Sequence, residues 1–298
     1  MYEHAFGQVS GFALDAFHAV ASRWRKGEQL DFRTGESHVY EVDSTGGYTE
    51  IPRPGVFASL WRSAAGRVFV AHKDGALFTR DTGGSWSQFD VRASLLGVWG
   101  LDDEHVWAWG LRGKSPVMYQ SSGRESWVEI ASPPELVFNM AGDRSDRLMA
   151  VGMKGMIALW DGRRWRPQAS PVTGALSSIH WISEDEIYAC GTGTPFVLEG
   201  SVHGWARRGP FELPLHCVAK HSNKLWVGCG AGGLRALPGD RDELELVKAK
   251  IQPWHFDPRG DLLISCRDMI AATKDGVSFQ GVPIVGYETI TANQAPSF

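Results

Sequence analysis

Two series of short motifs recur along the chain at nearly the same interval, and they agree with each other. The first series consists of apolar runs that end in small residues, and their starts lie 37 to 42 residues apart: VFVAH from Val68, VWAWG from Val106, LMAVG from Leu148, IYACG from Ile187, LWVGC from Leu225 and LLISC from Leu262. The second consists of aromatic residues spaced by 38 to 41 residues, with one member missing before the last: Tyr48, Trp86, Trp127, Trp165, Trp205 and Phe279. The chain is therefore a repeat of units of about 40 residues.

Within each unit, apolar residues alternate with a period of two rather than 3.6. Residues 56–62, 68–72, 76–80 and 86–91 are four such runs, separated by Gly, Asp and Ser turns, and this pattern predicts short strands. Residues 241–250 (RDELELVKAK) are the only segment that favours a helix. One four-stranded sheet cannot bury both of its faces, whereas radially stacked copies cover one another. We therefore predict an all-β fold, a seven-bladed β-propeller with four antiparallel strands per blade.

The same interval sets the expected blade boundaries within one domain over residues 1–298. Stepping back 38 residues from the Val68 run aligns residues 30–32 with 68–70 and residues 39–40 with 77–78, which supplies a first blade. Residues 1–16 and 285–298 are expected to be closure or tail segments. Both contain strand-like pieces, and the pattern does not decide which of them completes the first or the last blade. The predicted blades are 17–54, 55–92, 93–134, 135–173, 174–212, 213–250 and 251–284.

Composition and charge exclude several classes of protein. With 43% hydrophobic residues, 21% charged residues and a net charge of −4, the chain can form a core and lacks the basic surface of a nucleic-acid clamp. No stretch approaches the ~18 uninterrupted apolar residues of a spanning helix. The N-terminal region carries Glu3 and Asp15 instead of the pattern of a secretory signal, and the cysteines form no CxxC pair. We expect a cytoplasmic monomer that binds neither nucleic acid nor membrane. Its four cysteines are Cys190, Cys217, Cys229 and Cys266.

A turn motif carries a resemblance to a known repeat family. The segment TRDTGGSW at residues 79–86 resembles the Asp-box of BNR-type β-propellers, S/T-x-D-x-G-x-T/S-W, at every defined position, and weaker copies occupy residues 43–48, 160–165 and 273–279. In such a turn the Asp accepts backbone N–H bonds, the Gly takes a positive φ angle and the aromatic packs between blades. The resemblance implies a propeller. It implies no single function, because such propellers serve as sialidases, sorting-receptor ectodomains, assembly factors and interaction platforms.

Catalytic and cofactor motifs are missing from the sequence. It contains no GxSxG elbow, no GxxxxGK[ST] loop and no HExxH, and its ten histidines do not cluster at ligand spacing. Sialidases in the Asp-box family resemble one another in an arginine triad, a Tyr/Glu pair and a Phe-Arg-Ile-Pro signature, and the nearest approach here is the misordered IPRP at residues 51–54. The glycine-rich segment GCGAGG at 228–233 has no helix pattern after it. We predict no catalytic residues, no metal and no cofactor.

Candidate binding residues fall into two sets. The first stands seven residues before an apolar run, where a propeller strand faces the central channel, although the same residues would also be explained by packing against the next blade: Trp61, Trp99, His180 and His255. The second lies in acidic turns between the first and second strands of a blade: Asp102, Asp103, Glu104, Glu184, Asp185 and Glu186, with Asp143, Asp146, Asp257 and Asp261 in equivalent turns. Turns between the second and third strands lean basic: His72, Lys73, Arg112, Lys114, Lys154 and Arg267. Ordinary solvated turns would have a similar composition.

These features favour a non-enzymatic propeller that presents its loop faces to a protein partner. An acidic face suits a basic partner, so a neutralising or immunity-type partner of a basic toxin fits, as does an assembly scaffold. Variable loops at residues 131–135 and 209–214 suit the same task. The alternative is a glycan-directed, sialidase-like hydrolase or lectin with its site at the channel mouth, which would require three convergent arginines together with Tyr and Glu. The arginines are numerous enough to keep that alternative open.

Overall fold

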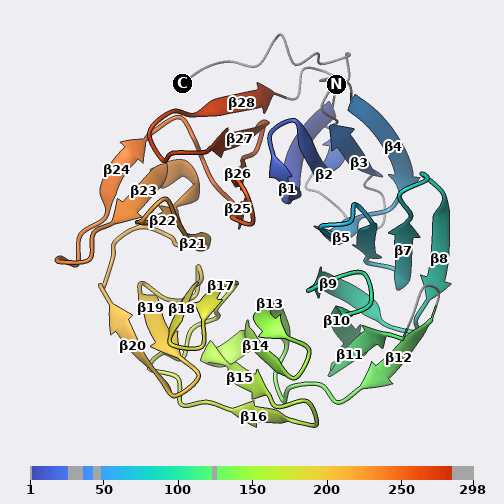
Figure 1. Cartoon of the computed structure of the whole chain (residues 1–298), viewed down its shortest axis with the longest axis horizontal. Coiled ribbons are helices and arrows are strands. Elements are labelled where there is room, and N and C mark those ends of the chain that lie inside the picture. Colours follow the sequence, from blue (N-terminus) through green and yellow to red (C-terminus); the bar gives the residue numbers. More distant parts are fainter. Residues whose placement is uncertain (1, 26–35, 43–47, 123–125, 284–298) are drawn as a thin grey trace. The chain divides into compact units, whose positions relative to one another are not determined.

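The structure, a computed structural model, describes residues 2–25, 36–42, 48–122 and 126–283. In these ranges the chain forms 28 strands in seven four-stranded sheets, together with two short 3-10 turns (Figure 1). The fold is an all-β, seven-bladed propeller, as the repeat predicted. The chain divides into two compact units: Met1–Val98 with Trp254–Phe298 form unit 1, and Trp99–Pro253 form unit 2. The described residues contain no helix with the length and apolar character needed to span a bilayer.

Unit 1 contains blades 1, 2 and 7 and the start of blade 3. Blade 1 consists of β1 (Tyr2–Ala13), β2 (Ala16–Arg25), β3 (Glu36–Val42) and β4 (Tyr48–Pro54). Blade 2 consists of β5 (Phe57–Arg62), β6 (Val68–His72), β7 (Ala76–Arg80) and β8 (Trp86–Asp90). Blade 7 consists of β25 (His255–Asp257), β26 (Leu262–Ser265), β27 (Met269–Thr273) and β28 (Gln280–Pro283).

Unit 2 contains most of blade 3 and all of blades 4 to 6. Blade 3 consists of β9 (Ser94–Gly100), β10 (Val106–Arg112), β11 (Ser115–Ser121) and β12 (Trp127–Ile130), and blade 4 of β13 (Val137–Arg144), β14 (Arg147–Gly152), η1 (Met153–Gly155), β15 (Ile157–Trp160) and β16 (Trp165–Pro167). Blade 5 consists of β17 (Ser178–Ser183), β18 (Glu186–Cys190), β19 (Val197–Ser201) and β20 (Gly204–Arg208). Blade 6 consists of β21 (Cys217–His221), β22 (Lys224–Gly228), η2 (Gly230–Gly232), β23 (Leu234–Leu237) and β24 (Glu245–Lys248).

The two sequence series correspond to fixed positions in the blades. The apolar runs form the second strands, so that Val68 begins β6 and Leu262 begins β26. These strands are the most buried of their blades, and every residue of β6 and β26 is buried. The aromatic series marks the outermost strands, where Trp86 begins β8 and Trp165 begins β16. The apolar series therefore marks the buried second strand of each blade, and the aromatic series marks the outer edge.

Blade 1 and the end of blade 6 differ from the expected pattern. Blade 1 begins at Tyr2 rather than at residue 17, because β1 pairs with β2 in antiparallel register and is the first strand of the sheet. Residues 30–32, which the 38-residue step aligned with β6, lie outside the described residues. The segment 241–250 is not helical: it contains β24, whose residues pair with β23. Cross-strand pairing there overrides the helix propensity of a charged segment.

The Asp-box turns have the geometry that the motif implies. The Asp81 carboxylate accepts the Ser85 backbone N–H at 2.8 Å, and Gly84 has φ +88°. In the copy at 160–165, the Asp161 carboxylate accepts two backbone N–H bonds, from residues 163 and 164, at 3.0 and 2.9 Å. Asp275 likewise accepts two backbone N–H bonds at 2.8 Å, from residues 277 and 278. The carboxylates of these aspartates therefore hold the turns through hydrogen bonds to the backbone. The copy at 43–48 falls largely outside the described residues.

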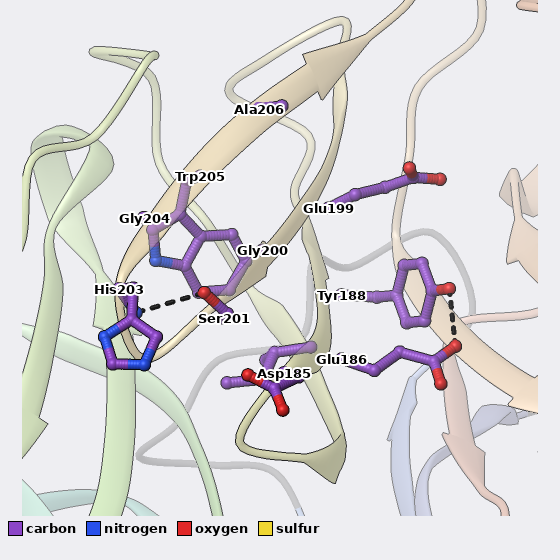
Figure 2. A pocket seen from close by; sticks show the side chains of 11 residues that line it. Asp185, Glu186, Tyr188, Glu199, Gly200, Ser201, His203, Gly204, Trp205 and Ala206 are labelled. Atoms are coloured by element: carbon purple, nitrogen blue, oxygen red, sulfur yellow. Dashed lines mark hydrogen bonds between the residues drawn. The ribbon is translucent and has the colours of Figure 1, made fainter.

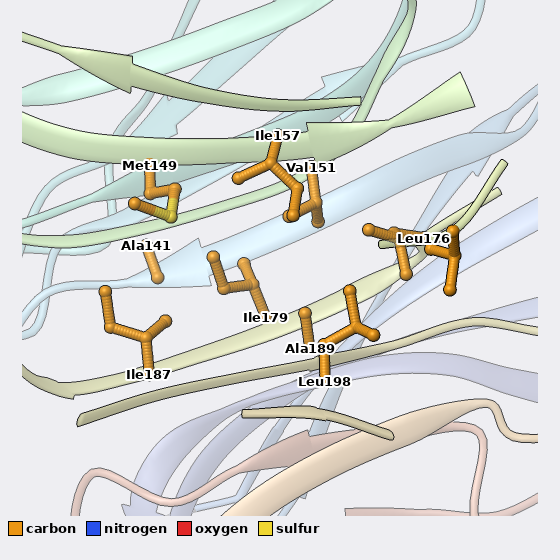
Figure 3. Packing of buried hydrophobic residues seen from close by; sticks show 10 residues of the cluster. Ala141, Met149, Val151, Ile157, Leu176, Ile179, Ile187, Ala189 and Leu198 are labelled. Atoms are coloured by element: carbon orange, nitrogen blue, oxygen red, sulfur yellow. The ribbon is translucent and has the colours of Figure 1, made fainter. Parts of the chain in front are cut away.

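Adjacent blades within unit 2 pack through continuous apolar layers. Figure 3 shows the layer between blades 4 and 5, in which Met149, Val151 and Ile157 meet Ile179 and Leu198. A similar layer joins blades 5 and 6. Complete burial of one Ile or Leu side chain contributes about 1.5–3 kcal/mol, so each layer fixes the neighbouring turns firmly.

The first and last blades pack directly on each other within unit 1. Phe6, Val9 and Phe17 of blade 1 share one buried cluster with Leu263 and Ile270 of blade 7. Two backbone bonds cross the same junction, from the Phe6 N–H to the Arg267 carbonyl and from the Asp261 N–H to the Phe12 carbonyl. Each sheet is made of four consecutive strands, so blades 1 and 7 are joined by packing and by these bonds rather than by a shared sheet.

Candidate functional site

The acidic turn of blade 3 is held rigidly by one of its own carboxylates. The Asp102 Oδ1 atom accepts the backbone N–H groups of Glu104 at 2.9 Å and of His105 at 2.8 Å, and it also contacts the His105 Nδ1 atom at 2.9 Å. Although desolvation acts in the opposite direction, these hydrogen bonds hold the pKa of Asp102 below its usual value. Asp103 is half-buried, whereas Glu104 is exposed. Asp102 is exposed as well, but its carboxylate is engaged within the turn, so Glu104 is the exposed carboxylate that the turn leaves available.

The turns of blades 4 and 5 share their charges through ion pairs. Arg147 of blade 4 binds Asp143 of its own turn, with Nε to Oδ1 at 2.9 Å, and also pairs with Glu184 of blade 5. Glu186 pairs with Lys220 of blade 6, and that hydrogen bond is the main reason that its pKa is lowered. Three of the predicted acidic side chains, Asp143, Glu184 and Glu186, are thus partly neutralised by cations of the same or a neighbouring blade.

Two carboxylates of the predicted set remain available for a partner. Glu104 and Asp185 are exposed, and among the described residues their carboxylates make no hydrogen bond or ion pair. Asp257, by contrast, is 5% exposed and belongs to β25, so the sequence analysis was wrong to count it as a surface charge. The basic turns are partly neutralised in the same way, because Arg112 pairs with Glu129 and Lys154 with Glu135.

An open groove of about 620 Å³ lies on blade 5, beside the acidic turn 184–186. It is lined by residues 185–188, 199–201 and 203–206, which belong to β18, β19 and β20 and to the turns beside them (Figure 2). Tyr188 lies opposite Glu199 in the β18–β19 register, and Glu199 lies opposite Ala206 in the β19–β20 register. These three residues therefore share one face of the sheet. We refer to this feature as the blade 5 groove.

The polar wall of the groove is fixed from blade 6. The Tyr188 hydroxyl donates to the Glu186 carboxylate at 2.8 Å, and burial together with this bond raises the pKa of Tyr188. Arg208 contacts Glu199 at 3.1 Å and Asp242 at 2.7 Å, with its side chain only 13% exposed. Each carboxylate on this wall is thus held in place before any ligand arrives.

The other side of the hairpin is shaped by a glycine beneath a tryptophan. Gly200 lies opposite Trp205 in the register of β19 and β20. A Cβ atom on Gly200 would come within 2.4 Å of the Trp205 ring, so the indole can lie against the strand only because residue 200 is glycine. The sequence analysis identified Trp205 through its period but did not predict the groove. The pairing of a mid-strand glycine with this aromatic was the available signal.

The four predicted channel residues are divided between the two units. In unit 1, Trp61 is 4% exposed and packs against Phe69, while His255 is half-buried at the start of β25. In unit 2, Trp99 stacks on Trp107 with ring centroids 5.9 Å apart. His180 lies opposite Tyr188 in the register of β17 and β18. Their contact with a ligand stays a prediction.

A polar cluster around the buried Asp257 carboxylate joins blades 1, 2 and 7 beside Trp61. The two oxygens of the Asp257 carboxylate accept the Arg259 guanidinium at 2.9 and 2.6 Å, and Oδ2 also accepts the Gly11 N–H at 2.9 Å. The other bonds of Arg259 go to the Ser10 hydroxyl at 2.6 Å and the Arg62 carbonyl at 2.7 Å. This single guanidinium thus connects three blades.

Two arginines in this part of unit 1, Arg80 and Arg259, are engaged with internal carboxylates. Arg80 binds Glu41 through two contacts of 2.9 and 2.8 Å. The side-chain hydrogen bond with His18 is the main reason that the pKa of Glu41 is lowered to about 2. Burial acts in the opposite direction, and the charge of Arg80 adds to the lowering. Because Arg80 and Arg259 already have carboxylate partners, these two side chains differ from the arginines of a triad that is open to a substrate carboxylate.

Lowering the pH from 7 to 5 is expected to reduce the free energy of unfolding through His255. Desolvation lowers the pKa of His255 to about 4, whereas an unfolded histidine titrates near 6.5. The unfolded state therefore takes up the proton first, and the stability present above pH 6.5 is lost progressively as the pH falls towards 4. Urea unfolding at pH 7 and at pH 5 gives the difference in the free energy of unfolding between the two pH values. In His255→Asn this difference should be smaller than in the wild type by roughly 1–2 kcal/mol. The variant His203→Asn, at an exposed histidine, should keep the wild-type difference. Equal differences in all three proteins would contradict the assignment of the pH dependence to His255.

Across the described ranges, no three His, Cys, Asp or Glu residues lie close enough together to hold a metal ion. The four cysteines are buried and form no disulfide bonds with one another.

Comparison of sequences gives one informative relative. No protein-family model matches the chain. The chain is 27% identical over 182 residues to the immune protein Tsi7 of Pseudomonas aeruginosa, and the match covers 57% of this chain and 57% of that protein. The chain thus matches little more than half the length of this curated relative.

Comparison of structures supports the fold. A virginiamycin B lyase from Staphylococcus aureus, in an inactive form with quinupristin, superposes with a TM-score of 0.69 at 10% identity, covering 96% of this chain and all of that one. YCF48 bound to a D1 peptide gives a TM-score of 0.62 at 14% identity, covering 92% and 93%. The WD40 propeller of Doa1 gives 0.67 at 11% identity, covering 89% and 90%. At these identities, the likeness concerns the propeller architecture alone.

Proposed function

We propose that this chain is an immunity-type protein that neutralises a toxin by binding it, with the acidic turns of unit 2 forming part of the contact surface. The likeness to the immune protein Tsi7 carries this proposal. The exposed carboxylates of Glu104 and Asp185, on turns that are held rigidly, support a partner with a basic surface. The internal pairing of Arg80 and Arg259 favours binding over a sialidase-like reaction.

Growth rescue tests the proposal directly. A toxic effector encoded beside this chain's gene is expressed in a host that lacks the gene, with and without the chain. We expect co-expression to restore growth, and the two proteins to elute together as a stoichiometric complex in gel filtration. Growth that stays arrested while both proteins are soluble would contradict the proposal, as would release of a chromogenic aglycone from a sialoside by the purified chain.

A further inference from the structure

The blade 5 groove combines three properties that determine what can occupy it. It is open to solvent, its volume of about 620 Å³ falls in the range of ligand-binding clefts, and it is bounded by carboxylates on a rigid sheet. Asp185, Glu186 and Glu199 line it together with the ring of Tyr188 (Figure 2). A site of this composition favours a cation that can also contact an aromatic surface.

The charge around the groove is not balanced by the chain itself. Three cations, Arg147, Lys220 and Arg208, form the ion pairs of this region. They pair with five carboxylates, those of Asp143, Glu184, Glu186, Glu199 and Asp242. The sixth carboxylate, that of Asp185, makes no ion pair among the described residues. The region is therefore negative, and Asp185 lies in the groove lining where that charge is uncompensated.

An apolar contact lies beside the charged groove. Ile182, at 42% exposed, is one of the large apolar side chains that the described surface leaves in solvent, and it precedes the acidic turn by two residues. Protein interfaces combine desolvated apolar or aromatic contacts with charged pairs around them. The neighbourhood of the groove has both parts.

We infer that the blade 5 groove is the docking site for an arginine side chain of a basic protein partner. A guanidinium can bind the Asp185 carboxylate in a bidentate manner and stack on an aromatic ring, which suits arginine better than lysine. The inference rests on the proposed function and specifies which part of the surface receives the partner. Its test uses a defined peptide, so that it can fail independently of that function.

The probe is a fluorescein-labelled hexa-arginine peptide, with the hexa-citrulline peptide as its uncharged counterpart, titrated into the full chain at low ionic strength. Anisotropy should report saturable binding of the arginine peptide and none of the citrulline peptide. Asp185→Asn is expected to weaken binding about ten-fold, the effect of one lost charge-assisted hydrogen bond. Ala206→Lys, which places a competing amine on an exposed position of the groove, should weaken it at least as much.

The matched control is Asp240→Asn, which removes the same charge from an exposed position of unit 2 outside the groove. It should leave the affinity nearly unchanged. The inference is overturned if Asp240→Asn weakens binding as much as Asp185→Asn, because the attraction is then general. It is also overturned if the wild type does not bind the peptide, or if Asp185→Asn binds it like the wild type. The Asn variant keeps the shape of the turn, so it decides the question even if Ala206→Lys fails to fold.

The outcomes separate this inference from the proposed function. Growth rescue without an effect of the groove variants on peptide binding would retain the immunity role and reject the groove. Peptide binding in the groove without growth rescue would retain the groove and reject the immunity role.

Discussion

Replacing Asp257 by alanine is expected to destabilise the protein by about 1.5–3 kcal/mol, the cost of losing charge-assisted hydrogen bonds at a buried carboxylate whose partner, Arg259, keeps 29% of its side chain exposed. Asp257 is 5% exposed, and its carboxylate accepts two bonds from Arg259 and one from the Gly11 N–H. Its removal leaves the Gly11 N–H without its acceptor inside the junction of blades 1, 2 and 7, while the partly exposed Arg259 guanidinium keeps only its bonds to Ser10 and Arg62. Because this junction is where the first and last blades meet, the loss should affect the cooperative unfolding of unit 1.

Chemical denaturation of the full chain, monitored by tryptophan fluorescence, measures this effect. The matched control is Asp261→Ala, four residues away, because Asp261 contributes a backbone bond to Phe12 that the substitution retains. The control should stay within about 1 kcal/mol of the wild type. A similar loss in both variants, or a loss below about 1 kcal/mol for Asp257→Ala, would show that the ion pair does not hold the junction.

The double variant Glu104→Lys with Asp185→Lys is expected to lower the affinity for a basic toxin about a hundred-fold, mainly through slower association. Both side chains are exposed and lack internal partners among the described residues. Their reversal therefore changes the field of the acidic turns without breaking an ion pair of the fold. The stabilising pairs of Arg147 and Lys220 are left intact.

Surface plasmon resonance at several salt concentrations measures the association and dissociation rates. The difference between variant and wild type should shrink above about 0.1 M salt, where the screening length is ~10 Å. Asp240→Lys supplies the same reversal at another exposed site and should have little effect. An unchanged association rate in the double variant would contradict a role for the acidic turns, while growth rescue by the wild type would still support the immunity function.

Most of the blades could be predicted from the sequence, because the alternation of apolar residues within each strand reflects which of its side chains are buried. The expected runs 68–72 and 76–80 coincide with β6 and β7, since alternation and glycine turns act within a few residues. Blade 1 was misplaced because its phase was taken from the later repeats. The strands β1 and β2 depart from that phase, because the second strand of blade 1 is Ala16–Arg25 and not residues 30–32. The segment at β24 was misread because pairing with β23, not propensity, decides its conformation.

The acidic turns were predicted as exposed charges, and their compensation was missed. The cations that neutralise Glu184 and Glu186 are Arg147 and Lys220, which lie 37 and 34 residues away in the chain. Those separations are close to one repeat, so the partners belong to the adjacent blades. Aligning successive repeats for opposite charges at equivalent turns would have suggested the pairs. The groove itself depends on three strands meeting, which no single segment encodes.

The arrangement of the sheets has a consequence for how such a chain can change over evolutionary time. All four strands of each described sheet are consecutive in sequence, so one contiguous stretch of gene encodes one complete blade. Duplication, loss or exchange of a blade then requires a single recombination event, and a circular permutation between blades divides no sheet. Adaptation to a new partner can therefore proceed through replacement of one blade's turns, with the cores of the others unchanged.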